Sequence, residues 1–560
     1  MITIGIYGIH DTMYKGKSTC ATHDHSIAVM KDGEIVTVVQ LERFTGVKHD
    51  NRLSVFISSL LEKYAHTEET VRFVSVNSFM GNSFISSDGS LRIEPSGEIN
   101  VENIVSPAMC RFYPDGLRRK YVEAQIMSHE FAHIASILPF VGDFQPESLL
   151  VHIDGGASES ISSVWYYDGK TIQCLEYTWN KTKTAVNNFG INPLVNFILN
   201  HNPGDHLASP GKLMGYSSYG TSRPDIAEWL KENNWFLDFK GSKSKMLGII
   251  NERFDTHFDV FDSHNQFCMD IASCIQDEFE ETICSYIKYW AVQTGAKYLY
   301  YGGGASLNII TNTRLEQSGL FRKIYVTPAS NDSGLALGAV AYLEWLDKKC
   351  VKLHSPFLNS FDVPTYPESL SFSIEDVADF VQAGNFVGIC MGAAEVGPRA
   401  LGHRSIIARA DNVDLRKKVS EGIKKREWYR PIAPVIADIV ADAIFDDVVM
   451  EGNFASYMMG QYRVKDEYVA GLKGVVHTDG SVRPQIVRSD DKEQSFLYSL
   501  LKMMYDKFGT IGLINTSFNV RGKPIVHDPH DAFVVAQEIG LDGVIINNQL
   551  IKLKQSVSIK

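Results

Sequence analysis

The chain has 560 residues and a mass of 62.6 kDa, which exceeds the size of a typical single domain and predicts at least two packed units. With 44% hydrophobic and 21% charged residues, its composition is that of a globular protein and excludes disordered and collagen-like classes. A formal net charge of −12 provides no general attraction to nucleic-acid phosphates or to an anionic membrane, so we expect neither as a partner.

The N-terminal residues and the cysteines indicate the compartment. The chain begins with a strand-like alternation rather than a basic segment before an apolar stretch, and no apolar run reaches the roughly 18 residues of a spanning helix. The eight cysteines form no CxxC pair and are predicted to be reduced. We therefore expect a cytoplasmic protein.

The first predicted elements are a strand at residues 2–8, a polar loop, and a hairpin formed by strands at 26–31 and 34–40. This order is typical of the start of actin-like ATPase and sugar-kinase domains. A similar strand and turn recur at residues 148–153 and 160–167. The recurrence predicts an internally duplicated α/β domain.

A helical pattern covers residues 268–293, and a buried strand is predicted at 297–301, directly before three glycines. Prolines make the stretch 352–369 irregular, which predicts a linker. Strands are expected beyond it at residues 386–391, 511–514 and 543–546. The predicted fold is α/β throughout, with a first domain at 1–355, a linker at 356–370 and a second domain at 371–560.

Two histidines, His129 and His133, are spaced four residues apart and would share one face of a helix. With Glu130 between them, the segment also satisfies the HExxH pattern of zinc hydrolases. The pattern alone does not discriminate between metal hydrolysis, another metal role and two ordinary helical histidines.

Two aspartates add carboxylates to this set. Asp154 follows a predicted strand and precedes two glycines, and Asp332 introduces a helix rich in small residues, where it could also serve as an N-cap. Two histidines and one or two carboxylates suit iron, manganese or zinc. His152 is a competing donor, because strand alternation places it on the same side as Asp154.

The run 301–308 is the end of a predicted strand that breaks into a glycine turn before a helix. Such a turn exposes backbone N–H groups to a phosphate or a nucleoside, although a glycine triplet alone is equally typical of a tight turn.

Most of the cations that predict an anion site lie between residues 395 and 430. This stretch contains several arginines and lysines interrupted by glycines and prolines, which argues against a simple solvated helix face. Arginine forks match phosphate oxygens, and further polar groups follow at residues 479–485 and 515–522. These groups together predict a polyphosphate substrate.

Over essentially its whole length, the sequence resembles the NodU/CmcH family of O-carbamoyltransferases. The motifs that carry the resemblance lie at residues 23–28, 42–50, 129–133, 302–308, 332–334, 397–405, 426–434 and 515–522. The resemblance implies an actin-like first domain, similar to the transferase that makes threonylcarbamoyladenosine in tRNA, and a YrdC-like second domain.

The resemblance also implies a two-step reaction. The second domain would form carbamoyl-adenylate from carbamoyl phosphate and ATP with Mg²⁺, and the first would pass the carbamoyl group to a hydroxyl-bearing acceptor. The implied phosphate-binding and catalytic cations are Arg399, Lys424, Arg430 and Arg483. The implied nucleotide-binding residues are Arg404, Ser517 and Asn519 in the second domain, and Gly303, Gly304 and Asn308 in the first.

For the first domain, the resemblance assigns Fe²⁺ or a similar divalent metal to His129, His133, Asp154 and Asp332. Either His23 or His25 would be the base for the acceptor hydroxyl. The acceptor stays open among an aminoglycoside, a macrolide, a sugar and a hydroxymethylated nucleoside, and a homodimer is one option for the oligomeric state.

Two other functions compete with this one. A metal-dependent hydrolase would use Glu130 as its base and would not need the arginines of the second domain. A nucleotide-regulated binding protein of actin-like type would bind ATP without releasing pyrophosphate when carbamoyl phosphate is supplied.

Overall fold

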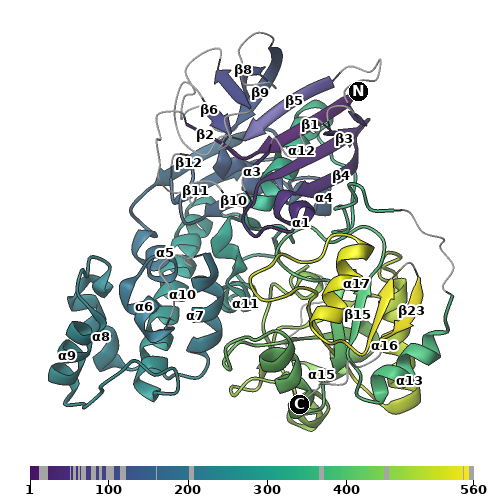
Figure 1. Cartoon of the computed structure of the whole chain (residues 1–560). Helices are drawn as coiled ribbons and strands as arrows, with labels where there is room; N and C mark the ends of the chain where they lie inside the picture. Colours follow the sequence, from purple (N-terminus) through teal and green to yellow (C-terminus); the bar gives the residue numbers. More distant parts are fainter. Residues whose placement is uncertain are drawn as a thin grey trace.

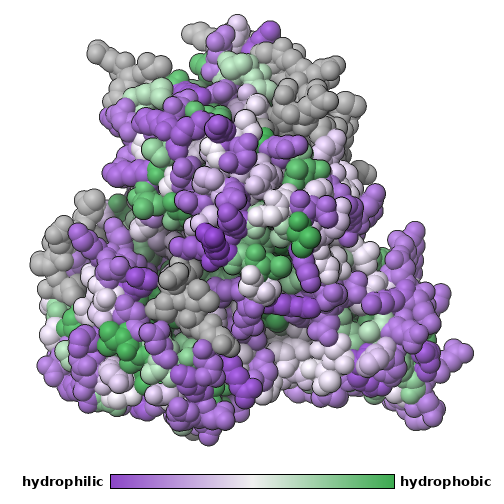
Figure 2. Space-filling model, turned by 180° about the vertical axis from the view of Figure 1, so that it is seen from behind, coloured by the Kyte–Doolittle hydropathy of each residue, from purple (hydrophilic) through white to green (hydrophobic). Residues whose placement is uncertain are grey.

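The structure is a computed structural model of the whole chain (Figure 1). It describes residues 1–11, 23–50, 52–53, 59–60, 63–64, 71–76, 84–86, 91–95, 106–113, 121–158, 160–200, 207–364, 371–446, 453–546 and 548–553. Within these ranges, no helix has the length and apolar character needed to cross a bilayer. Figure 2 shows that hydrophobic residues on the face opposite to that of Figure 1 lie in small groups among hydrophilic ones.

A nine-stranded sheet forms the first layer, in the order β2-β6-β7-β8-β9-β5-β1-β3-β4. β1 pairs antiparallel with β3 and parallel with β5, so the predicted opening strand and hairpin are confirmed. The strands are β1 (Ile2–Tyr7), β2 (Ile9–Asp11), β3 (Ser26–Lys31), β4 (Glu34–Gln40), β5 (Val71–Val76), β6 (Phe84–Ser86), β7 (Arg92–Pro95), β8 (Ala108–Tyr113) and β9 (Val122–Met127).

A five-stranded sheet, in the order β12-β11-β10-β13-β14, repeats the pairing pattern of the first. Its first three strands are antiparallel and the last two join in parallel, as in β4-β3-β1-β5-β9. The predicted duplication is therefore confirmed. The strands are β10 (Ser148–Ile153), β11 (Ser162–Tyr167), β12 (Ile172–Thr178), β13 (Tyr298–Gly302) and β14 (Lys323–Tyr325).

Two helices, α3 (His129–Ala135) and α12 (Leu335–Lys348), pack against each other and connect the two sheets. α12 contacts β1, β3 and β5 of the first sheet, whereas α3 contacts β10 and β13 of the second. All seven residues of α3 are buried, so this helix is part of the core rather than an amphipathic surface helix. The short helices α1 (Leu41–Thr45) and α4 (Leu138–Val141) lie nearby.

A helical segment is inserted between β12 and β13, and α8 and α9 form its outer end at the lower left of Figure 1. The helix predicted at 268–293 is confirmed as α10, with Asn265 as its N-cap and left-handed Gly295 as its C-cap. The helices are α5 (Lys183–Gly190), α6 (Pro193–Ile198), α7 (Ser209–Ser217), α8 (Pro224–Glu232), α9 (Lys243–Phe254) and α10 (Gln266–Thr294), and α11 (Ile309–Gln317) follows β13.

The C-terminal part forms a seven-stranded sheet in the order β20-β17-β21-β16-β15-β22-β23, beside a two-stranded pair of β18 and β19. The three strands expected from the sequence are confirmed as β15, β21 and β22 within a few residues. The strands are β15 (Val387–Cys390), β16 (Arg404–Arg409), β17 (Ala433–Ala437), β18 (Tyr462–Arg463), β19 (Ser481–Val482), β20 (Gln485–Val487), β21 (Leu513–Ser517), β22 (Gly543–Ile546) and β23 (Gln549–Lys552).

Helices cover both faces of this sheet. α13 and α16 contribute to one hydrophobic cluster, whereas α15 and α17 contribute to the other. The helices are α13 (Ile374–Gln382), α14 (Val413–Lys417), α15 (Asp438–Ile444), α16 (Ser495–Phe508) and α17 (Pro529–Glu538). Mixed sheets with helices packed on them confirm the predicted α/β class in both parts of the chain.

The connection between the two parts is bonded to both of them. The backbone N–H groups of Val351 and His354 donate to carbonyls beside α4, and Asn359 exchanges two backbone hydrogen bonds with Ala394. The Leu358 carbonyl also accepts from the N–H of Val38 in β4, so the described residues 356–364 of the predicted linker are bonded to both parts, and residues 365–370 lie outside the described residues.

Candidate active site

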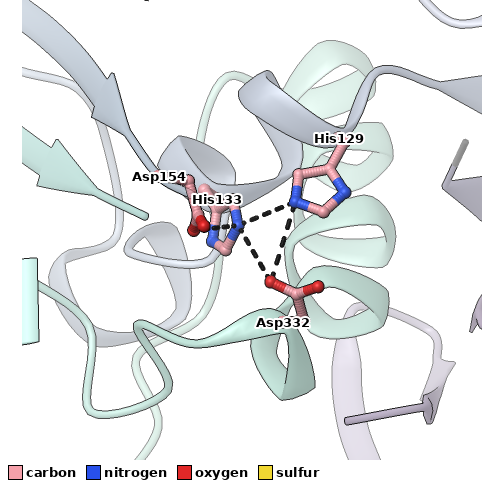
Figure 3. Close-up of side chains that lie close together, drawn as sticks. All are labelled: His129, His133, Asp154 and Asp332. Carbon is pink, nitrogen blue, oxygen red and sulfur yellow. Dashed lines mark hydrogen bonds and ion pairs between the residues drawn. The ribbon is translucent and has the colours of Figure 1, made fainter. Parts of the chain in front are cut away.

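His129 and His133 project from one side of α3, as their spacing predicts. Ser128 caps the helix, its Oγ accepting a 3.3 Å hydrogen bond from the N–H of Phe131. The two Nε2 atoms lie 3.1 Å apart (Figure 3), and neither side chain is more than 3% exposed. The helix therefore presents two imidazole nitrogens at a single buried point.

Asp154 and Asp332 reach the same point from the ends of different elements (Figure 3). His133 Nε2 lies 3.3 Å from Asp154 Oδ2 and 3.5 Å from Asp332 Oδ1. His129 Nε2 lies 3.7 Å from Asp332 Oδ1. One ligand atom from each of the four residues lies within 4.8 Å of the others, so the four predicted metal ligands converge. We call them the His/Asp cluster.

Backbone and side-chain donors orient both carboxylates. The N–H of Gly304 donates to Asp154 Oδ2 at 2.6 Å, and the N–H of Gly155 donates to Asp154 Oδ1. The hydroxyl of Tyr7 donates to Asp332 Oδ2 at 2.6 Å. Such outer contacts fix the carboxylates before any ligand arrives.

Protonation of His133 balances the negative charges of the two carboxylates in the cluster. Burial opposes the charged form of His133, but its hydrogen bonds to Asp154 and Asp332 raise its pKa to about 9. Burial lowers the pKa of His129 to about 4. Hydrogen bonding and charge interaction with His133 outweigh burial at Asp154 and hold the pKa of its carboxyl far below the usual range. The two carboxylates thus stabilise a positive charge at the point where the four side chains converge.

Of the two histidines predicted as the base, only His23 faces the cluster. Its Nδ1 lies 3.3 Å from Asp24 Oδ2 and its Nε2 lies 3.9 Å from Asp332 Oδ2. Burial opposes its charged form, but Asp332 and Asp24 raise its pKa to about 10. His25 is fully buried, and its ring packs edge-on against Tyr7.

Two other side chains near α3 lie outside the set of four. His152 stacks on His133 with ring centroids 5.4 Å apart, and both of its nitrogens are buried without a hydrogen-bond partner among the described residues. Glu130 is fully buried and accepts a hydrogen bond from the N–H of Ser160. The carboxylate that a zinc hydrolase would need as its base therefore does not join the cluster.

The residues of the glycine turn after β13 make close contacts and hydrogen bonds with other parts of the chain. Gly303 has a φ of +94°, and a Cβ there would be 2.3 Å from the carbonyl oxygen of Ile153. Asn308 caps α11 and exchanges hydrogen bonds with the side chain of Gln276. The adenylate contacts predicted for Gly303, Gly304 and Asn308 stay predictions, and the structure shows these residues supporting Asp154 and α11.

A separate cavity lies in the C-terminal part, beside β21. Among the described residues that line it, none carries a carboxylate. The lining residues are Pro398, Arg399, Ala400, Arg426, Pro431, Ile432, Ala433, Met458, Arg483, Asn515, Thr516 and Ser517. We call this the arginine cavity.

Two guanidinium groups of the arginine cavity have a donor atom without an acceptor among the described residues. The Nε atoms of Arg399 and Arg483 are buried and have no hydrogen-bond partner among the described residues. Burial, with added repulsion from Arg430, lowers the pKa of Arg399 to about 10 and that of Arg426 to about 9. Burial and neighbouring arginines also lower the pKa of Arg483 well below its usual value. Buried cations without acceptors are costly, and an anion in the cavity would relieve that cost.

Lys424, whose predicted phosphate contact stays a prediction, donates hydrogen bonds to the protein. Its ammonium donates to the backbone carbonyls of Ser517 and Asn519 at 2.7 and 2.6 Å, and to the side-chain oxygen of Asn519. Asn519 is not among the lining residues, whereas Ser517 is. Lys424 therefore fixes the turn after β21, because its donors point to that turn.

Arg404 and Arg430 also lie outside the cavity lining. The buried guanidinium of Arg404 donates to the backbone carbonyls of Met391, Gly392, His403 and His527. These four carbonyls hold the Arg404 side chain in place, and the nucleotide-binding role predicted for it stays a prediction.

Arg430 pairs with Glu427, their nearest charged atoms being 3.8 Å apart. Glu427 also pairs with Lys212 at 3.1 Å and Arg521 at 3.4 Å. Arg430 therefore contributes to a charged network behind the cavity, and any direct phosphate contact stays a prediction.

Comparison with known proteins identifies the family of the chain. Residues 109–341 match the model described as Carbamoyltransferase N-terminus, and residues 378–553 match the one described as Carbamoyltransferase C-terminus. The two matches together span well over half of the chain. The chain belongs to the carbamoyltransferase family. The resemblance seen in the sequence is therefore confirmed, and the protein is an enzyme of carbamoyl transfer.

Curated relatives match this carbamoyltransferase along most of their length. Nodulation protein NolNO of Sinorhizobium fredii is 26% identical over 99% of this chain and 82% of its own. Nodulation protein U of Rhizobium tropici is 25% identical over 90% of this chain and 91% of its own. Among solved structures, full-length HypF is 17% identical over 34% of this chain and 22% of its own, with a TM-score of 0.24.

Two residues of the carbamoyltransferase's arginine cavity, Arg426 and Asn515, lie in motifs named from the sequence but were not predicted individually as site residues. Arg426 lies between Lys424 and Arg430 in a dense run of cations, and the sequence could not show which of these side chains faces inward. Asn515 donates to the side chain of Gln485 at 2.6 Å, which positions it in the cavity wall. Its position after a predicted strand is the signal that marked the polar segment 515–522, but that signal did not separate Asn515 from its neighbours.

Proposed function

We propose that this carbamoyltransferase makes carbamoyl-adenylate from carbamoyl phosphate and ATP in the arginine cavity. We propose further that the His/Asp cluster then transfers the carbamoyl group to an acceptor hydroxyl. The N-terminal part would be an actin-like transfer domain and the C-terminal part a YrdC-like adenylate-forming domain. The observation that carries the proposal is a pair of guanidinium groups, Arg399 and Arg483, each with a buried, unpartnered Nε, in a cavity whose described lining residues include no carboxylate.

Carbamoyl phosphate and ATP are both anionic and repel each other. Guanidinium groups that the fold has already buried and oriented would bring them together without further reorganisation, which is how electrostatic catalysis is most effective. Water would first cleave carbamoyl phosphate into carbamate and phosphate. A carbamate oxygen would then attack the α-phosphorus of ATP, and pyrophosphate would leave.

In the second step, the acceptor oxygen would attack the carbamoyl carbon and AMP would leave. His23 is the residue placed to take the hydroxyl proton, because Asp24 binds its Nδ1 and leaves its Nε2 directed toward Asp332. An aspartate on the far nitrogen also stabilises the imidazolium that forms.

The His/Asp cluster fits a divalent cation. Two imidazole nitrogens and two carboxylates are a donor set that suits iron, manganese or zinc, and the fold already stabilises positive charge there on His133. Fe²⁺ or a similar ion held by these four side chains would supply Lewis-acid polarisation of the carbamoyl carbonyl and would disfavour the protonated form of His23 by charge repulsion.

The first experiment separates the two steps. The protein is incubated with ATP, Mg²⁺ and carbamoyl phosphate but no acceptor, and pyrophosphate and carbamoyl-AMP are measured. We expect carbamoyl-phosphate-dependent pyrophosphate from the wild type and from His129→Ala, and a loss of at least about 100-fold in Arg399→Ala. Equal loss in His129→Ala and Arg399→Ala would contradict the division between the two sites.

A further inference from the structure

Arg43 of the N-terminal part reaches into the C-terminal part. It lies in α1 and is only 2% exposed. Its Nη1 donates to the carbonyl of Glu395 and its Nη2 to the carbonyl of Gly397, both at 2.6 Å. A guanidinium that binds two carbonyls in this way fixes the spacing between them, because its donors form a rigid fork.

The segment that Arg43 binds is closed into a loop around Arg399. Glu395 Oε1 accepts hydrogen bonds from the N–H groups of Leu401 and Arg404, at 2.5 and 3.4 Å. Residues 395–401, which we call the Arg399 loop, are therefore joined at both ends, and Arg399 lies between them. Arg43 holds the first and third residues of this loop, Glu395 and Gly397.

A second contact joins the Arg399 loop to the N-terminal part. Gly397 has a φ of +90°, and a Cβ there would be 2.1 Å from the carbonyl oxygen of Pro328. Pro328 precedes Asp332 of the His/Asp cluster by four residues. The backbone of the Arg399 loop, which serves the arginine cavity, thus touches the segment that carries Asp332 of the His/Asp cluster.

We propose that Arg43 is a positioning residue that holds the Arg399 loop in its phosphate-binding shape. The arginine cavity of the C-terminal part would then depend on the N-terminal part for its geometry, although no described residue of that part lines the cavity. This inference rests on the proposed function, because it assumes that Arg399 binds phosphate.

The test compares Arg43→Met and Arg43→Lys with the wild type. Arg72→Met is the matched control, because Arg72 is a half-buried arginine that pairs with Asp347 and Gln125 away from both sites. Two quantities are measured: the Kd of inorganic phosphate by calorimetry, and the KM for carbamoyl phosphate in the pyrophosphate assay. Bound metal per chain after reconstitution reports whether the His/Asp cluster has stayed folded.

We expect Arg43→Met to raise both the Kd and the KM at least tenfold with metal content unchanged. Arg43→Lys should give values between those of Arg43→Met and the wild type, and Arg72→Met should match the wild type. A folded Arg43→Met protein with wild-type phosphate affinity would overturn the inference. Should Arg43→Met not fold, Arg43→Lys and Gly397→Ala decide in the same way, since both disturb the loop. A wild-type protein that neither binds phosphate nor releases pyrophosphate would instead refute the proposed function.

Discussion

Gly338 of α12 lies directly against Ala132 of α3. A Cβ on Gly338 would be 2.0 Å from the carbonyl oxygen of Ala132 and 2.9 Å from the N–H nitrogen of Ser136. Ala132 precedes His133, and the loop before α12 carries Asp332. The distance between the proposed metal ligands on α3 and Asp332 before α12 is therefore set by the absence of a side chain at residue 338.

Gly338→Ala is expected to push the two helices apart and weaken the His/Asp cluster. Overpacking of a tight core contact costs about 1–3 kcal/mol of unfolding free energy. We expect a loss of stability in that range and less bound metal per chain, measured by denaturant titration and elemental analysis. Gly248→Ala in α9 is the control, because a Cβ there meets nothing within 4 Å and should leave both quantities at or above wild type.

Glu130→Gln distinguishes carbamoyl transfer from metal-dependent hydrolysis. The Glu130 carboxylate accepts from the N–H of Ser160 and lies outside the His/Asp cluster, so it is not placed to activate a metal-bound water. We expect this variant to bind metal like the wild type and to keep carbamoyl transfer within about tenfold, whereas an HExxH hydrolase loses far more when its general base is removed. Measured metal content and transfer to a hydroxyl acceptor decide between the two.

The fold was readable where the sequence pattern is local. Alternation of apolar and polar residues predicted the opening hairpin, and a long run of apolar residues at helical spacing predicted α10. The i, i+4 spacing of His129 and His133 placed both side chains on one side of a helix. Asp154 and Asp332 could be added because each lies at the end of a predicted element. These signals span only a few residues, and local geometry determines where such side chains point.

The roles of the buried cations could not be read in the same way. Lys424 and Arg404 belong to the same basic region as Arg399, but their donors bind backbone carbonyls that the fold brings next to them. Arg43 is separated by 352 residues in the sequence from the Glu395 carbonyl that it binds. The tertiary fold decides which cation binds a backbone carbonyl and which one faces an open cavity. The amino-acid composition of a segment does not predict this.

Glu316 of α11 should make stability depend on pH. It accepts a 3.0 Å hydrogen bond from the hydroxyl of Tyr462, and burial raises its pKa from 4.5 to about 7. A carboxyl with a raised pKa in the folded state favours folding while protonated, and this contribution disappears as the pH rises from about 4.5 through about 7. The melting temperature of the wild type relative to Glu316→Gln should therefore fall between pH 5 and pH 8.

The size of this effect is at most about 3 kcal/mol, since each pKa unit corresponds to about 1.4 kcal/mol and the side chain is only partly buried. Thermal melts of both proteins across this pH range measure it. A constant difference in melting temperature would show that Glu316 does not titrate near neutrality. Glu232→Gln, at an exposed position of α8, provides the control and should show no such trend.

Lys424→Met should destabilise the C-terminal part before it affects any ligand directly. The substitution leaves the partly buried carbonyls of Ser517 and Asn519 without their charged donor, which costs about 1–3 kcal/mol, the range for a lost charge-assisted hydrogen bond. We expect a lower denaturation midpoint together with weaker phosphate binding, because Ser517 lines the arginine cavity. Lys425→Met, at the exposed neighbouring position, should leave both unchanged. A Lys424→Met protein with wild-type stability but no phosphate affinity would show instead that the ammonium binds the phosphate itself.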